Sequence, residues 1–189
     1  MSESERTPTF WLQWINLKRG KMDTNQLKSS IKSILDRINS QKYKDDHDLL
    51  LLWIEYINLE ILQNQPYSII NDLFKLLGRS NIGVNHSLLY TTWAKFECQS
   101  KHLEKAREIL RVAIQSKVQP LNLLQDTLEY VNSIDGSDIP KENMHNVDLL
   151  KVTQGPNRRP LQEKLPRSVS LESHFSKRLE ESGEYTQSF

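Results

Sequence analysis

Large apolar residues recur along residues 8–134 in steps of three and four, the spacing that places side chains on one face of a helix. One aromatic-bearing set returns 42 positions later and then a further 37 positions later, and a second set keeps the same offsets. The pattern predicts three copies of a two-helix unit. The first sets are Trp11, Trp14 and Leu17, then Trp53, Tyr56 and Leu59, then Tyr90, Trp93 and Phe96; the second sets are Leu27, Ile31, Ile34 and Leu35, then Ile69, Leu73, Leu76 and Leu77, then Ala106, Leu110, Ala113 and Ile114.

One such hairpin cannot bury its apolar face alone, so three stacked copies are expected to share a continuous core. A bulky Trp93 is expected to nest against small residues such as Ala106 and Ala113. A last apolar face over about 120–132 predicts a helix that caps the stack, and a helical bundle with accidental register is the alternative. The predicted repeat core is Trp11, Trp14, Trp53, Tyr56, Tyr90, Trp93, Ala106, Leu110 and Ala113.

The character of the chain changes after residue 134. Residues 135–189 hold four of the seven prolines and no tryptophan, and their apolar residues show no sustained period. Such a segment cannot bury enough surface to offset the entropy of ordering it. We therefore predict a helical repeat domain over 8–134 and a mostly disordered tail over 135–189.

The charge balance argues against several classes of protein. The chain has 25 basic and 24 acidic residues, which is against a dedicated nucleic-acid or membrane-surface binder. The longest apolar run, 49–54, is far shorter than the ~20 residues of a membrane span, and the first residues do not resemble a signal peptide. These features predict a soluble intracellular protein. Its one cysteine, Cys98, is expected to be a buried structural thiol.

No catalytic or cofactor-binding pattern is evident. The five histidines are scattered without the spacing of zinc ligands, and the six glycines form no phosphate-binding loop. The kinase signature motifs are also missing from the sequence. We therefore expect a protein that is not an enzyme, with no catalytic residues, no metal and no cofactor.

Several of these residues resemble known helical repeats. Tyr90, Trp93 and Ala94, with Ala106 and Ala113, have spacings similar to those of a tetratricopeptide (TPR) repeat. The aromatic-bearing sets also resemble half-a-TPR (HAT) repeats. The resemblance implies an all-α fold, an α-solenoid of three TPR-like helical hairpins plus a capping helix.

A more specific resemblance covers roughly residues 10–132. The segments 43–46 with 52–56, and 81–84 with 88–94, are similar to the N-terminal TPR region of the Bub/Mad spindle-checkpoint proteins. The segment 113–124 resembles both that region and the TPR domain of the monopolar-spindle kinase. The resemblance implies a non-catalytic interaction module of the spindle checkpoint, located in the nucleus or at the kinetochore and otherwise cytoplasmic. Its partners would be kinetochore or checkpoint proteins that dock as a peptide or helix; a HAT-type scaffold in RNA processing is the alternative.

The predicted tail carries two further motifs. Lys141, Glu142 and Asn143 look like a KEN box, a degron that binds the anaphase-promoting complex, and the preceding Pro140 favours an extended backbone there. Ser168 and Ser170 follow Arg167 in a pattern similar to a basophilic kinase site. A chance occurrence of the tripeptide is the alternative to the KEN box, and an unmodified, solvated linker is the alternative to the kinase site.

Overall fold

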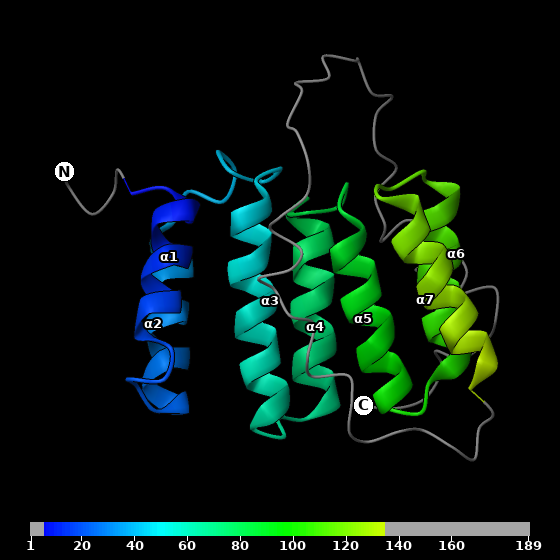
Figure 1. The fold of residues 1–189 in the computed structure, drawn as a ribbon, viewed down its shortest axis with the longest axis horizontal. Coiled ribbons are helices and arrows are strands. Elements are labelled where there is room, and N and C mark those ends of the chain that lie inside the picture. Colours follow the sequence, from blue (N-terminus) through cyan, green and yellow to red (C-terminus); the bar gives the residue numbers. More distant parts are fainter. Residues whose placement is uncertain (1–5, 135–189) are drawn as a thin grey trace, which may run out of the picture. The chain divides into compact units, whose positions relative to one another are not determined.

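The computed structural model describes residues 6–134, so the predicted tail, 135–189, lies outside the described residues. Within 6–134 the chain forms seven helices (Figure 1). The predicted domain 8–134 falls inside this range, and none of its helices has the length and apolar character needed to cross a membrane. The helices are α1 (Pro8–Lys18), α2 (Thr24–Arg37), α3 (His47–Leu62), α4 (Tyr67–Arg79), α5 (Ser87–Gln99), α6 (Leu103–Gln115) and α7 (Leu121–Ser133).

Polar side chains fix the first turns of the first three helices. Thr7 caps α1, and Asp23 forms a reciprocal capping box with Gln26 at the start of α2. Asp46 caps α3, where its carboxylate accepts a 2.8 Å hydrogen bond from the backbone N–H of Asp48. Each cap satisfies backbone donors that the first helical turn leaves unpaired.

The ends of α3, α4, α5 and α6 share one backbone motif. After each helix a non-glycine residue adopts a positive φ, and the following N–H bonds back to a carbonyl in the last turn, as Ile82 does to Leu77 at 2.9 Å. This is the Schellman arrangement, which turns the chain sharply into the next element. The four positive-φ residues are Asn64, Asn81, Lys101 and Lys117.

The helices pack in the order of the chain. The pairs α1–α2, α3–α4 and α5–α6 are hairpins in contact, and α1, α3, α5 and α7 contact one another in succession. Figure 1 shows this progression from α1 to α7. The predicted solenoid of three hairpins is confirmed, and α7 packs on α5 and α6 as its cap.

The predicted register of α4 is wrong by one residue. Of the four matched residues Leu77 is buried, but Ile69 and Leu76 are 45% and 40% exposed, and the unmatched Ile70 and Phe74 are buried instead. The start of α4 lies 43 residues after that of α2, one more than the offset of the aromatic sets. One residue turns a helix by about 100°, which moves the other set of side chains onto the core.

Candidate protein-interaction site

The residues predicted to form the repeat core do not share one degree of burial. Trp14 and Trp53 are only half-buried, and both lie in ring contacts with an aromatic neighbour on their own helix. The other seven predicted positions are buried: Trp11, Tyr56, Tyr90, Trp93, Ala106, Leu110 and Ala113.

Aromatic stacking joins the second hairpin to the third. The Phe74 ring on α4 stacks on Trp93 of α5, with centroids 5.6 Å apart and planes within 4° of parallel. Tyr67, also on α4, stacks on Phe96 at 5.4 Å. These contacts cover the face of α5 that carries Trp93 and Phe96. The sequence pattern did not predict Phe74 as the partner, because its matched set named Leu73 instead.

A fully buried carboxylate lies beside this stack. Glu97 on α5 has no exposed surface, and its Oε1 accepts a 3.0 Å hydrogen bond from the Trp93 indole one turn earlier. The Tyr67 hydroxyl donates to Oε2 at 3.0 Å, and His102 Nδ1 lies 3.1 Å from the same oxygen. Lys105 Nζ of α6 lies 2.8 Å from Oε1. We call these five residues the Glu97 cluster.

The Glu97 cluster ties three consecutive helices together. Lys105 also donates to the Tyr67 hydroxyl at 2.7 Å and to Asn71 Oδ1 at 3.1 Å, so α6 is bound to α4 across α5. A buried carboxylate is costly unless it is paired and hydrogen-bonded, and here both conditions are met. The cluster therefore contributes to the relative placement of the hairpins.

The second hairpin repeats part of this arrangement. Glu60 lies 37 residues before Glu97, is 6% exposed, and pairs with Lys28 of α2 at 3.0 Å. Tyr56, one turn before Glu60, takes the place of Trp93; burial and a hydrogen bond to Glu60 raise its pKa above the ordinary tyrosine value. The signal for both clusters was present in the sequence, as an aromatic residue followed four positions later by Glu in two of the three copies.

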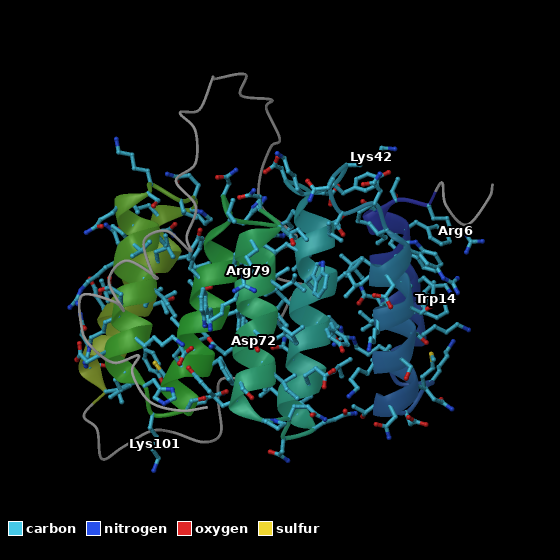
Figure 2. The ribbon with its side chains drawn as sticks, turned by 180° about the vertical axis from the view of Figure 1, so that it is seen from behind. Arg6, Trp14, Lys42, Asp72, Arg79 and Lys101 are labelled. Atoms are coloured by element: carbon cyan, nitrogen blue, oxygen red, sulfur yellow. The ribbon has the colours of Figure 1, made fainter. Side chains whose placement is uncertain are left out.

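The outer side of α4 carries the most compact exposed apolar stripe of the middle hairpin. Ile69 and Leu76 are exposed and Leu73, between them, is half-buried; we call these three residues the α4 outer face. Asp72 and Arg79, both labelled in Figure 2, lie three residues after Ile69 and Leu76 along one edge of this face, and Asp72 pairs with Lys75 at 3.7 Å.

The corresponding positions of α2 are polar. Counted back by the 43-residue spacing of the two helices, they are Gln26, Ser30 and Ser33. The fold therefore does not require apolar residues at these positions. An exposed apolar stripe that packing does not require marks a candidate interaction site.

A metal site or a reactive thiol would be a further functional feature of the described residues. Among residues 6–134, no group of three or more His, Cys, Asp or Glu side chains is arranged to hold a metal ion. Cys98 is fully buried, and burial raises the pKa of its thiol from 9.0 to about 11, with Arg107 opposing the shift and Glu97 adding to it. A thiol in such surroundings is a structural side chain and not a nucleophile.

We expect Cys98 to resist alkylation in the folded protein. A pKa raised by two units leaves about 100-fold less thiolate near pH 8 than an ordinary cysteine has, and burial slows the reagent further. Labelling with a maleimide, followed by mass spectrometry, checks this in native buffer and in denaturant, where the same thiol is its own control. Equal rates in the two conditions would show that Cys98 is accessible.

Two predicted motifs cannot be placed against this geometry. The candidate degron, Lys141, Glu142 and Asn143, and the candidate phosphosites, Ser168 and Ser170, all lie outside the described residues. They remain predictions from the sequence.

Comparison with known proteins identifies relatives of the helical domain. The chain aligns at 23% identity over 140 residues with the spindle assembly checkpoint serine/threonine-protein kinase BUB1 of Saccharomyces cerevisiae, covering 68% of this chain and 14% of the kinase. It aligns at 27% identity over 120 residues with the mitotic checkpoint serine/threonine-protein kinase BUB1 beta of Homo sapiens, covering 61% of this chain and 11% of that kinase. The chain thus spans only a small part of the length of these relatives.

The fold is also shared with a known structure. The crystal structure of the conserved N-terminal domain of the mitotic checkpoint component BUB1 superposes with a TM-score of 0.58 at 19% identity, covering 96% of this chain and 80% of that one. The match therefore lies in a non-catalytic N-terminal region and not in a kinase domain. Residues 9–114, more than half of the chain, match the family described as Mad3/BUB1 homology region 1. The chain belongs to the Mad3/BUB1 homology region 1 family.

Proposed function

We propose that this protein is a non-catalytic protein-interaction module of the mitotic spindle assembly checkpoint. The observation that carries the proposal is the family match over residues 9–114, together with two relatives that are named as checkpoint kinases. The structure matched is that of an N-terminal domain, and stacked helical hairpins of this kind form extended surfaces suited to binding other proteins. The match favours this role over a HAT-type scaffold in RNA processing, which would have a similar architecture.

The docking partner we propose is a kinetochore protein, bound through the α4 outer face. Ile69, Leu73 and Leu76 are spaced by four and three residues, so they form one stripe along the helix. Such a stripe suits an amphipathic helix or extended peptide that lays apolar side chains along it. Asp72 and Arg79 follow Ile69 and Leu76 by three positions each, so one charge of each sign lies along the same edge of the stripe and can fix the direction of the partner.

Replacing Ile69 and Leu76 together by serine tests this surface. Each side chain is exposed, so the fold should be kept, while two lost apolar contacts at an interface weaken binding by about tenfold. We expect the fluorescently tagged double variant to lose its kinetochore signal in mitotically arrested cells. The melting temperature of the purified variant should stay near that of the parent.

Tyr130→Ser is the matched control, because Tyr130 is also 40% exposed but lies on α7. It should leave kinetochore recruitment unchanged. Normal recruitment of the α4 double variant would exclude this face as the docking surface. Recovery of splicing factors instead of kinetochore proteins, in affinity purification of the parent, would contradict the checkpoint function itself.

The candidate degron gives the proposed module a second partner, the anaphase-promoting complex. Replacing Lys141, Glu142 and Asn143 by alanine should lengthen the half-life of the protein as cells leave mitosis. The same replacement should leave the stability of the helical domain unchanged, because these residues lie outside residues 8–134. A cycloheximide chase after release from mitotic arrest measures the half-life. Equal decay of the parent and the triple variant would make the motif a coincidence.

A nuclear or kinetochore location follows from this function, with the cytoplasm as the location outside mitosis. Ser168 and Ser170 are proposed phosphorylation sites of the same module. Phosphopeptide mapping from arrested and cycling cells would detect them.

A further inference from the structure

The first helix presents an apolar stripe of its own. Phe10 and Leu17 are 39% and 69% exposed, and the half-buried Trp14 lies between them at a spacing of four and three residues. We call these three residues the α1 end face. Figure 2 shows Trp14 on the outer side of the first hairpin, at the same end of the helical array as Arg6.

The internal repeat allows the burial of this face to be compared with that of the equivalent faces in the other two copies. The residues matched to Trp14 are Tyr56 and Trp93, which are 8% and 5% exposed. The residues matched to Phe10 and Leu17 are buried in the same way: Leu52 and Leu89 for the former, Leu59 and Phe96 for the latter. Among the described residues, the α1 end face is therefore the one of three equivalent helix faces that is not buried.

In the second and third copies, which begin with α3 and α5, the equivalent face is covered by the second helix of the preceding hairpin. On α5, Trp93 and Phe96 lie against Phe74 of α4. On α3, the face contacts α2, which contributes Lys28 to Glu60. The structural element that fits this face twice within the chain is thus an amphipathic helix.

The charge on the α1 end face is opposite to that of its counterparts. The position of Glu60 and Glu97 is occupied in the first copy by Lys18, which lies over the Trp14 ring at 5.8 Å. From Arg6 to Met22 the sequence has four basic residues and no acidic one; Arg19 pairs with Glu55 of α3 at 2.9 Å, so Lys18 supplies the charge beside Trp14. In the second and third copies, the covering helix provides a cation or a hydroxyl donor to this Glu side chain. Because the first copy has a lysine at that position, a helix that covers it should provide a carboxylate.

We propose that the α1 end face docks an acidic amphipathic helix of a partner protein, which places apolar residues on Phe10, Trp14 and Leu17 and a carboxylate beside Lys18. A second copy of this chain is a poor occupant, because pairing two such faces would bring two sets of basic residues together. This surface is separate from the α4 outer face, and the inference does not depend on the proposed function.

The repeat supplies the probe for the test. A fluorescein-labelled, hydrocarbon-stapled peptide with the sequence of α2, Thr24–Arg37, carries the apolar face that already fits α3. The acidic probe has Lys28→Glu and Lys32→Glu, and the basic probe keeps both lysines. Fluorescence anisotropy with the full chain should show the acidic probe binding at least about tenfold more tightly at low salt, with the difference reduced at high salt.

Variants of the chain then assign the binding to α1. Leu17 and Lys18 are exposed, so Leu17→Ser and Lys18→Glu should preserve the fold. Leu17→Ser should weaken the acidic probe about tenfold, and Lys18→Glu should shift the preference toward the basic probe. Equal binding of both probes, or no effect of either variant, would overturn the proposal.

Two other occupants are also distinguishable. A dimer in sedimentation velocity that Leu17→Ser abolishes would place a second copy on the face. A carbodiimide cross-link from Lys18 to residues 135–189 of the same chain would place the chain's own C-terminal part there. Either result would overturn docking of a partner helix, whereas a monomer without that cross-link supports it.

Discussion

Replacing Trp93 by alanine is expected to lower the free energy of unfolding by about 3–5 kcal/mol, a large share of the stability of a domain of this size. Trp93 is 5% exposed, its ring stacks on Phe74 of the preceding helix, and its indole N–H donates to the buried Glu97. Truncation therefore leaves a cavity between two hairpins and removes a donor from a buried carboxylate. Urea denaturation followed by circular dichroism measures the change.

Trp14→Ala is the matched control, since Trp14 occupies the same repeat position in the first hairpin. Its ring is half-buried, and it lies edge-on to the Trp11 ring of the same helix. We expect Trp14→Ala to lower the free energy of unfolding by less than about 2 kcal/mol. The substitution removes less buried apolar surface than Trp93→Ala does, and it opens no cavity between hairpins. Equal losses for the two variants would contradict the covering of α5 by α4.

The hairpins were predictable because burial in a helix leaves a period that is visible in the sequence. In α2 all four expected positions are buried, and in α6 three of the four are, with Ile114 half-buried. The cap, α7, was also predictable, since its apolar residues recur on one face and Pro120 precedes its first turn.

The register of α4 was not predictable from the same pattern. Apolar residues lie on both sides of this helix, so Ile69 and Leu76 compete in the sequence with Ile70 and Leu77 for the core. Hydrophobicity alone cannot separate a buried set of apolar residues from an exposed one. The packing of Phe74 determines which set is buried, because its ring stacks on Trp93 of α5.

The position of Trp14 shows a second limit of the repeat. Matched residues are equally buried only where matched neighbours cover them, and the first hairpin has no preceding helix within the described residues. A sequence match identifies the helix face, whereas the neighbouring helix determines its burial.

The Glu97 cluster was missed because its members come from separate segments of the chain. Tyr67 and Lys105 are 30 residues before Glu97 and 8 residues after it, and no local period relates them. Only the fold brings α4, α5 and α6 together around one carboxylate. The aromatic-to-Glu spacing that recurs in two copies was the single local sign of it.

Replacing Lys105 by methionine should destabilise the domain by about 2–4 kcal/mol. Breaking a buried ion pair costs about 3–5 kcal/mol, and the lower range applies because nearly a third of the Lys105 side chain is exposed. Methionine keeps most of the aliphatic stem, so the loss reports the ammonium group, which otherwise lies against Glu97, Tyr67 and Asn71. Chemical denaturation of the purified protein measures it.

Lys75→Met is the matched control for Lys105→Met. Lys75 pairs with Asp72 at 3.7 Å on the surface of α4, so its replacement should cost less than about 0.5 kcal/mol. A second substitution then isolates the charge. In the Lys105→Met background, Glu97→Gln should recover more than about 1 kcal/mol, because it removes a buried charge that has lost its cation while it keeps an oxygen that can accept from Trp93 and Tyr67. Additive losses in the double variant would mean that Lys105 and Glu97 stabilise the domain independently, and that the cluster is not a charge-compensated unit.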